Sequence, residues 1–408
     1  DWADEDPKWF EEARRSYATL IQRYGGDDLY LGRMLRYFIR TDNLKEILPL
    51  KARFLGERRN PLDALSMAEL GGYLMDKGML DDVSVLLEEA AKRDPTVPET
   101  HFELARYFRH TASTGEERKA LDNAVRTYRA LPALTTKRTA GYIESLIWRG
   151  RFRIAEGQWI GAEEDFTAAA AAYEDAVGLR RIPRGAHFHE TFAGEAYAGL
   201  AEVAFRQRDD LASALQLYER AAANGYDTAD SRYRRGYILY RTGRYAEALE
   251  QLYTAGRMGS EGPYLSFAFG AALYAREDWS AAEGYFRKVK DMVSDELAGI
   301  DSPAPREDSH QAELVTLLMK ADNNLGAALF NVANRLGNAR LRAQAYASFA
   351  EATRSYDELG LGSAEQAKPE DRNLGLLNMN LALNPRRGVS PVVYSEIEQD
   401  PSFPKKQL

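Results

Sequence analysis

Histidines and carboxylates are the side chains of this sequence that could support a metal site or acid–base chemistry. The chain has five histidines, and the closest pair, His187 and His189, stands beside Glu190. A metal site on a helix needs its ligands on one face, whereas residues two apart on a helix point in different directions. The spacing therefore favours a solvated helix N-terminus after Gly185, and we predict no bound metal.

Motifs of the common enzyme classes are absent from the sequence, which contains no GxxxxGK[ST], GxSxG or HExxH pattern and no cysteine. Adjacent carboxylates occur at expected helix starts, where they favour the positive end of the helix dipole; they are Asp81 with Asp82, Glu163 with Glu164, and Asp209 with Asp210. We therefore predict neither a catalytic site nor a cofactor. An enzyme hidden in a degenerate region is an alternative, which a cleft of carboxylates with raised pKa values would support.

Composition indicates a folded chain that has enough apolar surface for a core. Hydrophobic residues make up 45% and charged residues 28% of the 408 residues, and the net charge is −8. Acidic and basic residues are interleaved, which argues against nucleic acid as a partner. No apolar run approaches the roughly 20 residues that a membrane-spanning helix needs.

Two segments 34 residues apart repeat one pattern. RRGYILYRTGRYAEALEQLY (residues 234–253) matches AFGAALYAREDWSAAEGYFR (residues 268–287) in its glycine, aromatic and alanine positions. A glycine in the first helix (Gly236, Gly270) allows close approach of the second helix, where a small residue receives it. A helical glycine costs about 1 kcal/mol relative to alanine, so its recurrence at one register indicates close packing.

Looser copies of the pattern extend over most of the chain and predict about eight helix pairs. The cleanest further copy spans residues 64–98, and the last one fits only if both helices are about two turns longer than usual. We divide the sequence into an N-terminal helix (1–28), degenerate repeats (29–178), regular repeats (179–294), a long-helix unit with a capping helix (295–383), and an extended proline-rich tail (384–408). Loops are expected at 294–308 and 360–369.

These repeats resemble the tetratricopeptide repeat (TPR) superfamily from about Leu29 to Leu359. The resemblance implies an all-α, right-handed α-solenoid with a concave groove, lined by first helices, that binds peptides, helices or neighbouring subunits. In its general character the chain is also similar to the periplasmic flagellar-collar scaffolds of spirochaetes, although no motif carries this similarity.

The first helices of the C-terminal half carry an aromatic stripe. Tyr233, Tyr237 and Tyr240 are spaced i, i+4 and i+7, which puts them on one helix face. This face departs from the Lys/Asn carboxylate clamp of one TPR subgroup and favours an apolar or helical partner segment. A core position between adjacent helices is equally compatible with the spacing. The predicted groove residues are Tyr233, Tyr237, Tyr240, Arg241, Tyr264, Phe267, Tyr274, Asn323 and Phe330.

Taken together, the sequence predicts a non-enzymatic scaffold or adaptor that binds other proteins and supports assembly of a larger complex, such as a cell-envelope or flagellar one. The tail would pack on the chain itself or on a neighbour. A helical module for small ligands or glycans is the alternative, because aromatic faces also stack on sugars. The absence of cysteine favours the bacterial periplasm over the cytoplasm. The start at Asp1 without Met leaves room for an upstream signal peptide, lipid anchor or domain.

Overall fold

A computed structural model describes residues 28–56, 63–178, 187–300, 310–358, 369–386 and 388–394, together with Glu12, Arg15, Ser16, Thr19, Leu20, Gln22 and Arg23. Most of the predicted N-terminal helix and of the two predicted loops lies outside these residues; the described residues between Glu12 and Arg23 are helical. One loop boundary can be compared, because α15 continues to Ala298, past the loop start expected at residue 294.

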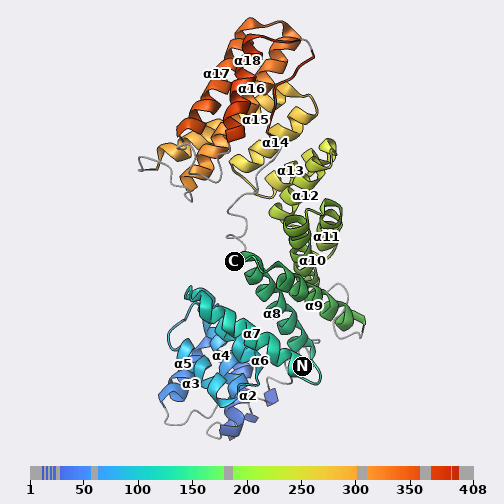
Figure 1. The fold of residues 1–408 in the computed structure, drawn as a ribbon. Coiled ribbons are helices and arrows are strands. Elements are labelled where there is room, and N and C mark those ends of the chain that lie inside the picture. Colours follow the sequence, from blue (N-terminus) through green and yellow to red (C-terminus); the bar gives the residue numbers. More distant parts are fainter. Residues whose placement is uncertain are drawn as a thin grey trace. The chain divides into compact units, whose positions relative to one another are not determined.

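The regular elements of the described residues are all helices (Figure 1). They are α2 (Asp28–Arg40), α3 (Leu44–Gly56), α4 (Ala64–Asp76), α5 (Val83–Arg93), α6 (Pro98–His110), α7 (Thr114–Ala130), α8 (Thr136–Ala155), α9 (Trp159–Gly178), α10 (His187–Arg208), α11 (Leu211–Ala223), α12 (Ala229–Arg241), α13 (Tyr245–Arg257), α14 (Pro263–Ala275), α15 (Trp279–Ala298), α16 (His310–Leu336), α17 (Ala339–Glu358) and α18 (Pro369–Leu383).

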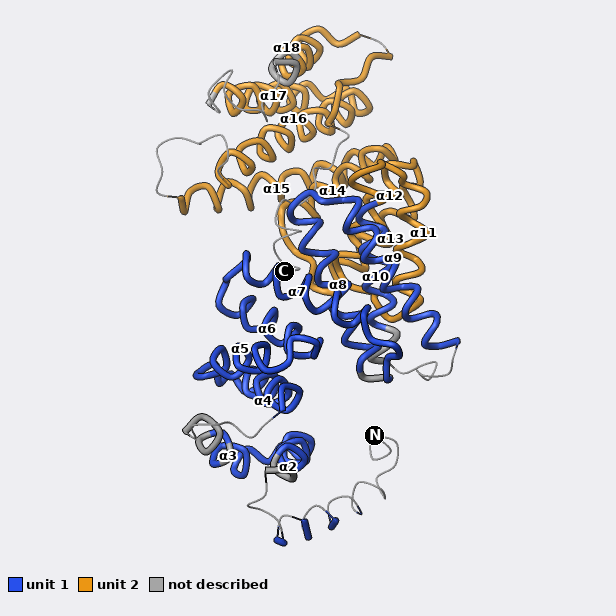
Figure 2. Tube along the Cα trace, turned by 60° about the horizontal axis from the view of Figure 1, so that its bottom comes forward, with its two compact units in different colours: residues 1–203 blue, residues 204–408 orange. Residues whose placement is uncertain are grey.

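The chain forms two compact units, residues 1–203 and 204–408, here called unit 1 and unit 2 (Figure 2). In unit 1, α2 packs on α3, α4 on α5, α6 on α7 and α8 on α9, and α4 also contacts α6. In unit 2, α12 packs on α13, α14 on α15 and α16 on α17, with α18 against α17. The first helices α12, α14 and α16 contact one another in turn. Helix α10 crosses the boundary between the units.

Local sequence signals start several of these helices. The Asp63 carboxylate accepts a hydrogen bond of 2.7 Å from the Ser66 amide at the start of α4. Thr228 and Ser231 form a reciprocal capping box at the start of α12. These side chains satisfy amide groups that have no partner within the first helical turn, so they fix where each helix begins.

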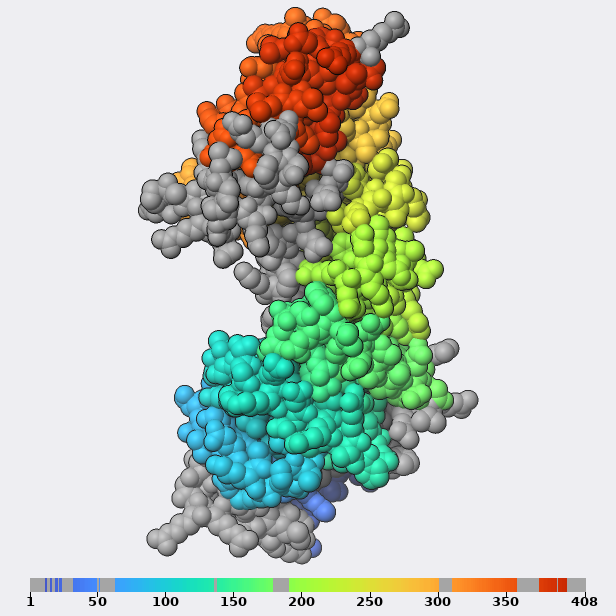
Figure 3. Space-filling model, in the orientation of Figure 1, coloured from blue at the N-terminus to red at the C-terminus, as the bar shows by residue number. Residues whose placement is uncertain are grey.

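Glycines mark the points where paired helices touch. A methyl group built on Gly270 would lie 2.7 Å from Phe286, and one on Gly236 would lie 2.8 Å from Leu252. The same contact recurs in unit 1, where a methyl group on Gly71 would lie 2.7 Å from Leu87. The second-helix side chain therefore occupies the space that a β-carbon would need. Side chains close the spaces between the ribbons of each unit on the face shown in Figure 3.

These contacts confirm the predicted all-α solenoid of TPR-like helix pairs. The expected lengthening of the last pair is also present, because α16 has 27 residues and α17 has 20, against 13 each in α12 and α13. In the described part of the chain, no helix combines the length and the apolar character that crossing a membrane requires.

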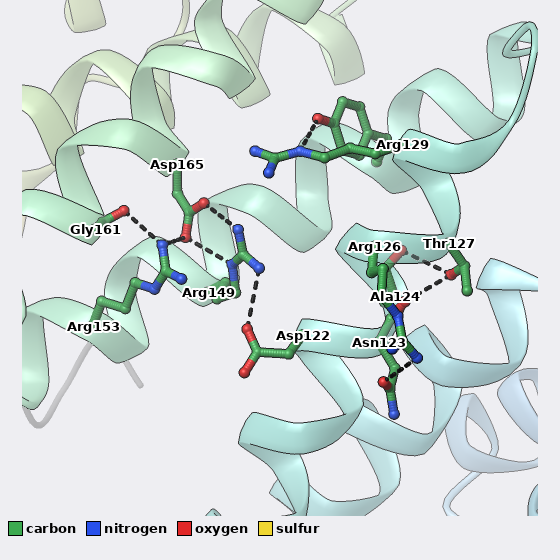
Figure 4. Close-up of polar contacts among 11 residues, drawn as sticks. Asp122, Asn123, Ala124, Arg126, Thr127, Arg129, Arg149, Arg153, Gly161 and Asp165 are labelled. Carbon is green, nitrogen blue, oxygen red and sulfur yellow. Dashed lines mark hydrogen bonds and ion pairs between the residues drawn. The ribbon is translucent and has the colours of Figure 1, made fainter.

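A buried ion-pair network joins three successive helices of unit 1 (Figure 4). Asp165 of α9 has no exposed surface, and its carboxylate accepts two hydrogen bonds from Arg149 of α8, at 2.9 and 2.6 Å. Arg153 donates a third, at 2.9 Å, and Arg149 also bonds Asp122 of α7 at 3.1 Å. One carboxylate thus holds two guanidinium groups and fixes how α9 lies on α8.

Candidate functional site

Most of the predicted aromatic groove lies inside unit 2. Tyr233, Tyr237 and Tyr240 are 6%, 6% and 9% exposed, and Phe267 and Phe330 are buried as well. Tyr237 packs edge-on against Phe205 of α10, with ring centroids 5.6 Å apart. These five side chains therefore fill the space between helices, and the core alternative describes their positions in this structure.

The remaining groove residues have different positions. Arg241 is exposed and pairs with Asp209 at 3.0 Å, and Tyr264 is half-buried. Tyr274, also half-buried, accepts a hydrogen bond of 2.9 Å from the Asn331 amide, which links α14 to α16. Asn323 is 1% exposed, and it belongs to a cluster of buried asparagines that is described below.

Arg234 lies beside the tyrosines on α12 and is buried with them. It has no exposed surface, and its guanidinium carbon lies 5.6 Å from the centre of the Phe205 ring. Phe205 of α10 thus lies against both Arg234 and Tyr237 of α12. A guanidinium at this distance from an aromatic ring gains a cation–π attraction.

Three buried asparagines grip a segment of the tail, and we call this arrangement the asparagine clamp. Asn324 of α16 accepts from the Tyr394 amide at 2.9 Å and donates to the Tyr394 carbonyl at 3.0 Å. Asn378 of α18 likewise accepts from the Val392 amide at 3.0 Å and donates to the Val392 carbonyl at 2.7 Å. Asn323 donates to the Val392 carbonyl at 3.1 Å and accepts from the Asn378 amide at 2.9 Å.

The geometry of the clamp is that of strand pairing made by side chains. In an extended chain, the N–H and C=O groups of residues i and i+2 point to the same side. Val392 and Tyr394 are two residues apart, and each offers both of its backbone groups to one asparagine. The asparagine side chains thus take the place of a neighbouring strand, and the contact uses backbone atoms that every peptide has.

Side-chain packing adds a second element to the clamp. Tyr394 packs against a small apolar cluster that includes Ala312 and Met319 of α16 and Tyr356 of α17. The Lys320 ammonium lies 5.7 Å from the centre of the Tyr394 ring. Pro391, which begins the segment, is buried. The site therefore combines backbone hydrogen bonds, which are independent of sequence, with an apolar pocket that accepts an aromatic ring.

Sequence reasoning found one member of the clamp and missed the others. Asn323 stands among the predicted groove residues, but Asn324 and Asn378 do not. The available signal was the pair Asn323–Asn324 in the middle of a helix, because two adjacent asparagines there disfavour the helix unless their amides have partners. The partners are 55 to 70 residues away along the chain.

In unit 1, charged side chains lie together on the first helices α4, α6 and α8. Arg106 of α6 pairs with Glu103 at 2.8 Å and also bonds Asp76 of α4. Burial raises the pKa of Glu103 to about 7, and the nearby Arg106 only partly offsets this. Burial also raises the pKa of Glu144 on α8 to about 7. Two carboxyl groups of this charged cluster therefore titrate near neutral pH.

This titration predicts that unit 1 loses stability as the pH rises. A carboxyl whose pKa is about 7 in the folded state and 4.5 in the unfolded state binds more protons when folded, so the unfolding free energy falls between these pH values. We expect Glu144→Gln to reduce the loss between pH 5 and pH 8 by about 1–2 kcal/mol. Urea unfolding of wild type and variant at both pH values measures this, and parallel pH profiles would contradict it.

No group of three or more His, Cys, Asp or Glu side chains in the described residues could hold a metal ion. The side chains of His187 and His189 lie outside those residues.

The paired helices and their glycine contacts define this chain as an all-helical repeat protein with a fold of TPR-like helix pairs. No protein-family model matches its sequence, and no curated protein does. Among solved structures it is similar to PilF of Pseudomonas aeruginosa, with 16% identity over 56% of this chain and 90% of that one and a TM-score of 0.43. A tetratricopeptide repeat protein from Parabacteroides merdae is 17% identical over 75% of this chain and 99% of that one, with a TM-score of 0.41. The C-terminal part of a TPR repeat-containing protein from Cytophaga hutchinsonii is 12% identical over 72% of this chain and 100% of that one, with a TM-score of 0.45.

Proposed function

We propose that this chain is a non-enzymatic protein-interaction scaffold that binds extended segments of partner proteins through unit 2. The asparagine clamp is the observation that carries the proposal. Its buried amides bind peptide backbone, namely residues 392 and 394 of the chain itself. Side chains that pair with the backbone of an extended segment are a device of peptide recognition.

The first-helix face of unit 2 provides further contact area in this proposal. Arg241 at the end of α12 and Tyr264 at the start of α14 retain exposed surface, so a partner could contact them without repacking the core. The buried aromatic residues of the predicted groove pack beneath this face, between the helices. They hold α12, α14 and α16 at fixed distances, which preorganises the surface for binding.

Pull-down from the native cell, read by mass spectrometry, tests this face. We expect Arg241→Ala combined with Tyr264→Ala to weaken capture of direct partners at least about 10-fold, because aromatic and arginine side chains contribute most to interfaces. Tyr253→Ala on the second helix α13 is the matched control, since Tyr253 is 61% exposed and lies outside the first-helix face. Equal loss in both variants, or in neither, would argue against the face.

The assembly that this scaffold would serve is proposed to lie in the bacterial cell envelope, with a flagellar collar as the specific case. The support is the general character of the sequence and its lack of cysteine. Cell fractionation of the tagged chain and cross-linking mass spectrometry in the native cell test this placement. Recovery in the cytoplasmic fraction, with cross-links only to cytoplasmic proteins, would refute it.

A further inference from the structure

The segment 391–394 is bound by unit 2 in the manner of a ligand. Between Val392 and Tyr394 on one side and the clamp asparagines on the other, five hydrogen bonds join backbone atoms to side-chain amides. The segment belongs to no helix, and its partners come from α16 and α18.

When the segment leaves, the clamp asparagines lose hydrogen-bond partners that another peptide backbone could replace. Asn323 and Asn378 would still bond each other, but Asn324 would lose both of its 2.9–3.0 Å partners and retain only the 3.4 Å contact from Asn323. Asn324 is 1% exposed with the segment bound, and a polar group that stays buried without a partner costs about 1–3 kcal/mol. Unit 2 is therefore stabilised by whichever extended segment occupies the clamp.

The middle of the segment is only partly buried, whereas Pro391 is buried and Tyr394 packs against an apolar cluster. Val392 is 45% exposed and Val393 is half-buried, so the main anchors are the amide contacts and the Tyr394 ring. A four-residue segment outside the helices opens at a smaller free-energy cost than the helical core. Exchange of the segment thus leaves the helices in place.

We propose that residues 391–394 are a displaceable internal ligand, and that the clamp accepts in their place an extended segment of a partner protein. This rests on the proposed function and names the partner class. The partner segment has free N–H groups at two positions, i and i+2, and an aromatic residue at i+2 that enters the Tyr394 pocket. Proline is excluded at both positions because it has no N–H group.

The internal ligand regulates the site by competition. A segment tethered by a short connection has an effective concentration in the millimolar range, so a free peptide of similar intrinsic affinity competes poorly. The chain is then closed to weak partners and open to a segment that binds more tightly or is presented at high local concentration.

Fluorescence anisotropy with a labelled peptide of residues 388–396 (GVSPVVYSE) tests the proposal on the full-length chain. We use Val392→Pro with Tyr394→Pro as the release variant, because each proline removes an N–H group that the clamp accepts. The peptide should bind this variant at least about 10-fold more tightly than it binds wild type, where the tethered segment competes. Replacing the tyrosine of the peptide by alanine should weaken binding to the variant at least about 10-fold.

Two further variants make the outcome decisive. Asn324→Asp keeps the shape of the side chain but removes the donor to the Tyr394 carbonyl, so in the release background it should abolish peptide binding. Tyr394→Ala alone leaves the amide contacts intact and should give an intermediate affinity, which serves as the readout if the double proline variant does not fold. Equal peptide affinity for wild type and released chains, or no binding to either, would overturn the proposal.

The failures of the two proposals can be told apart. If peptide binding fails while cross-links to partners persist in the native cell, the scaffold function stands and the clamp is only structural. Concentration-dependent dimers of wild type that Asn324→Asp abolishes, measured by light scattering, would assign the site to the tail of a second copy and overturn the proposed partner segment.

Discussion

Replacing Asp165 with alanine is expected to lower the unfolding free energy of unit 1 by about 3–5 kcal/mol. Asp165 is fully buried and accepts hydrogen bonds from Arg149 and Arg153. Its removal leaves the guanidinium group of Arg149, whose side chain is only 11% exposed, without its main counter-charge. A buried charge that loses its partner keeps the full cost of desolvation, which explains the size of the effect. Urea unfolding followed by circular dichroism measures it.

Asp122→Ala is the matched control for this network. Asp122 also bonds Arg149, but its side chain is 50% exposed, so solvent can replace the lost contact. We expect a loss below about 1 kcal/mol. If both variants lose the same free energy, the network has no central role in holding α8 and α9 together.

Gly270→Val is expected to cost unit 2 about 2–3 kcal/mol, because a β-carbon at this position would lie 2.7 Å from Phe286. The glycine sits inside α14, where valine would otherwise be slightly favoured by helix propensity. A net loss therefore reports the close approach of α15. Thermal and urea unfolding of the variant give the number.

Gly284→Ala provides the opposite result in the same helix pair. Gly284 lies within α15, and nothing is within 4 Å of a β-carbon built there. Helix propensity alone then applies, and we expect a gain of up to about 1 kcal/mol. If Gly284→Ala destabilised the unit as much as Gly270→Val, close helix packing would not explain why a glycine recurs at positions 236 and 270.

The regular helix pairs could be predicted because the contacts that form them join residues close together in the sequence. Several helix pairs place a glycine of the first helix against an apolar side chain of the second, and Gly236 and Gly270 show this directly. Contacts within one pair span few residues, so a 34-residue period is enough to locate them. Helix ends were less certain, as the extension of α15 to Ala298 shows.

The candidate site could be predicted only in part. Spacing placed Tyr233, Tyr237 and Tyr240 on one helix face, but the period of a helix does not say whether a neighbour covers that face. Here Phe205 packs against Tyr237 and the tyrosines are buried. Asn323 was included in the predicted groove, whereas its role depends on Val392, which is 69 residues away.

The sequence alone determined the repeated helix pair, since its small residues recur wherever two consecutive helices must touch. Tertiary structure decided which polar groups meet, because Asp165 with its two arginines and the asparagines with residues 392 and 394 are brought together by packing and not by any period. Hydrogen bonds and ion pairs need their atoms within about 3 Å, and for partners far apart along the chain only the folded path sets that distance.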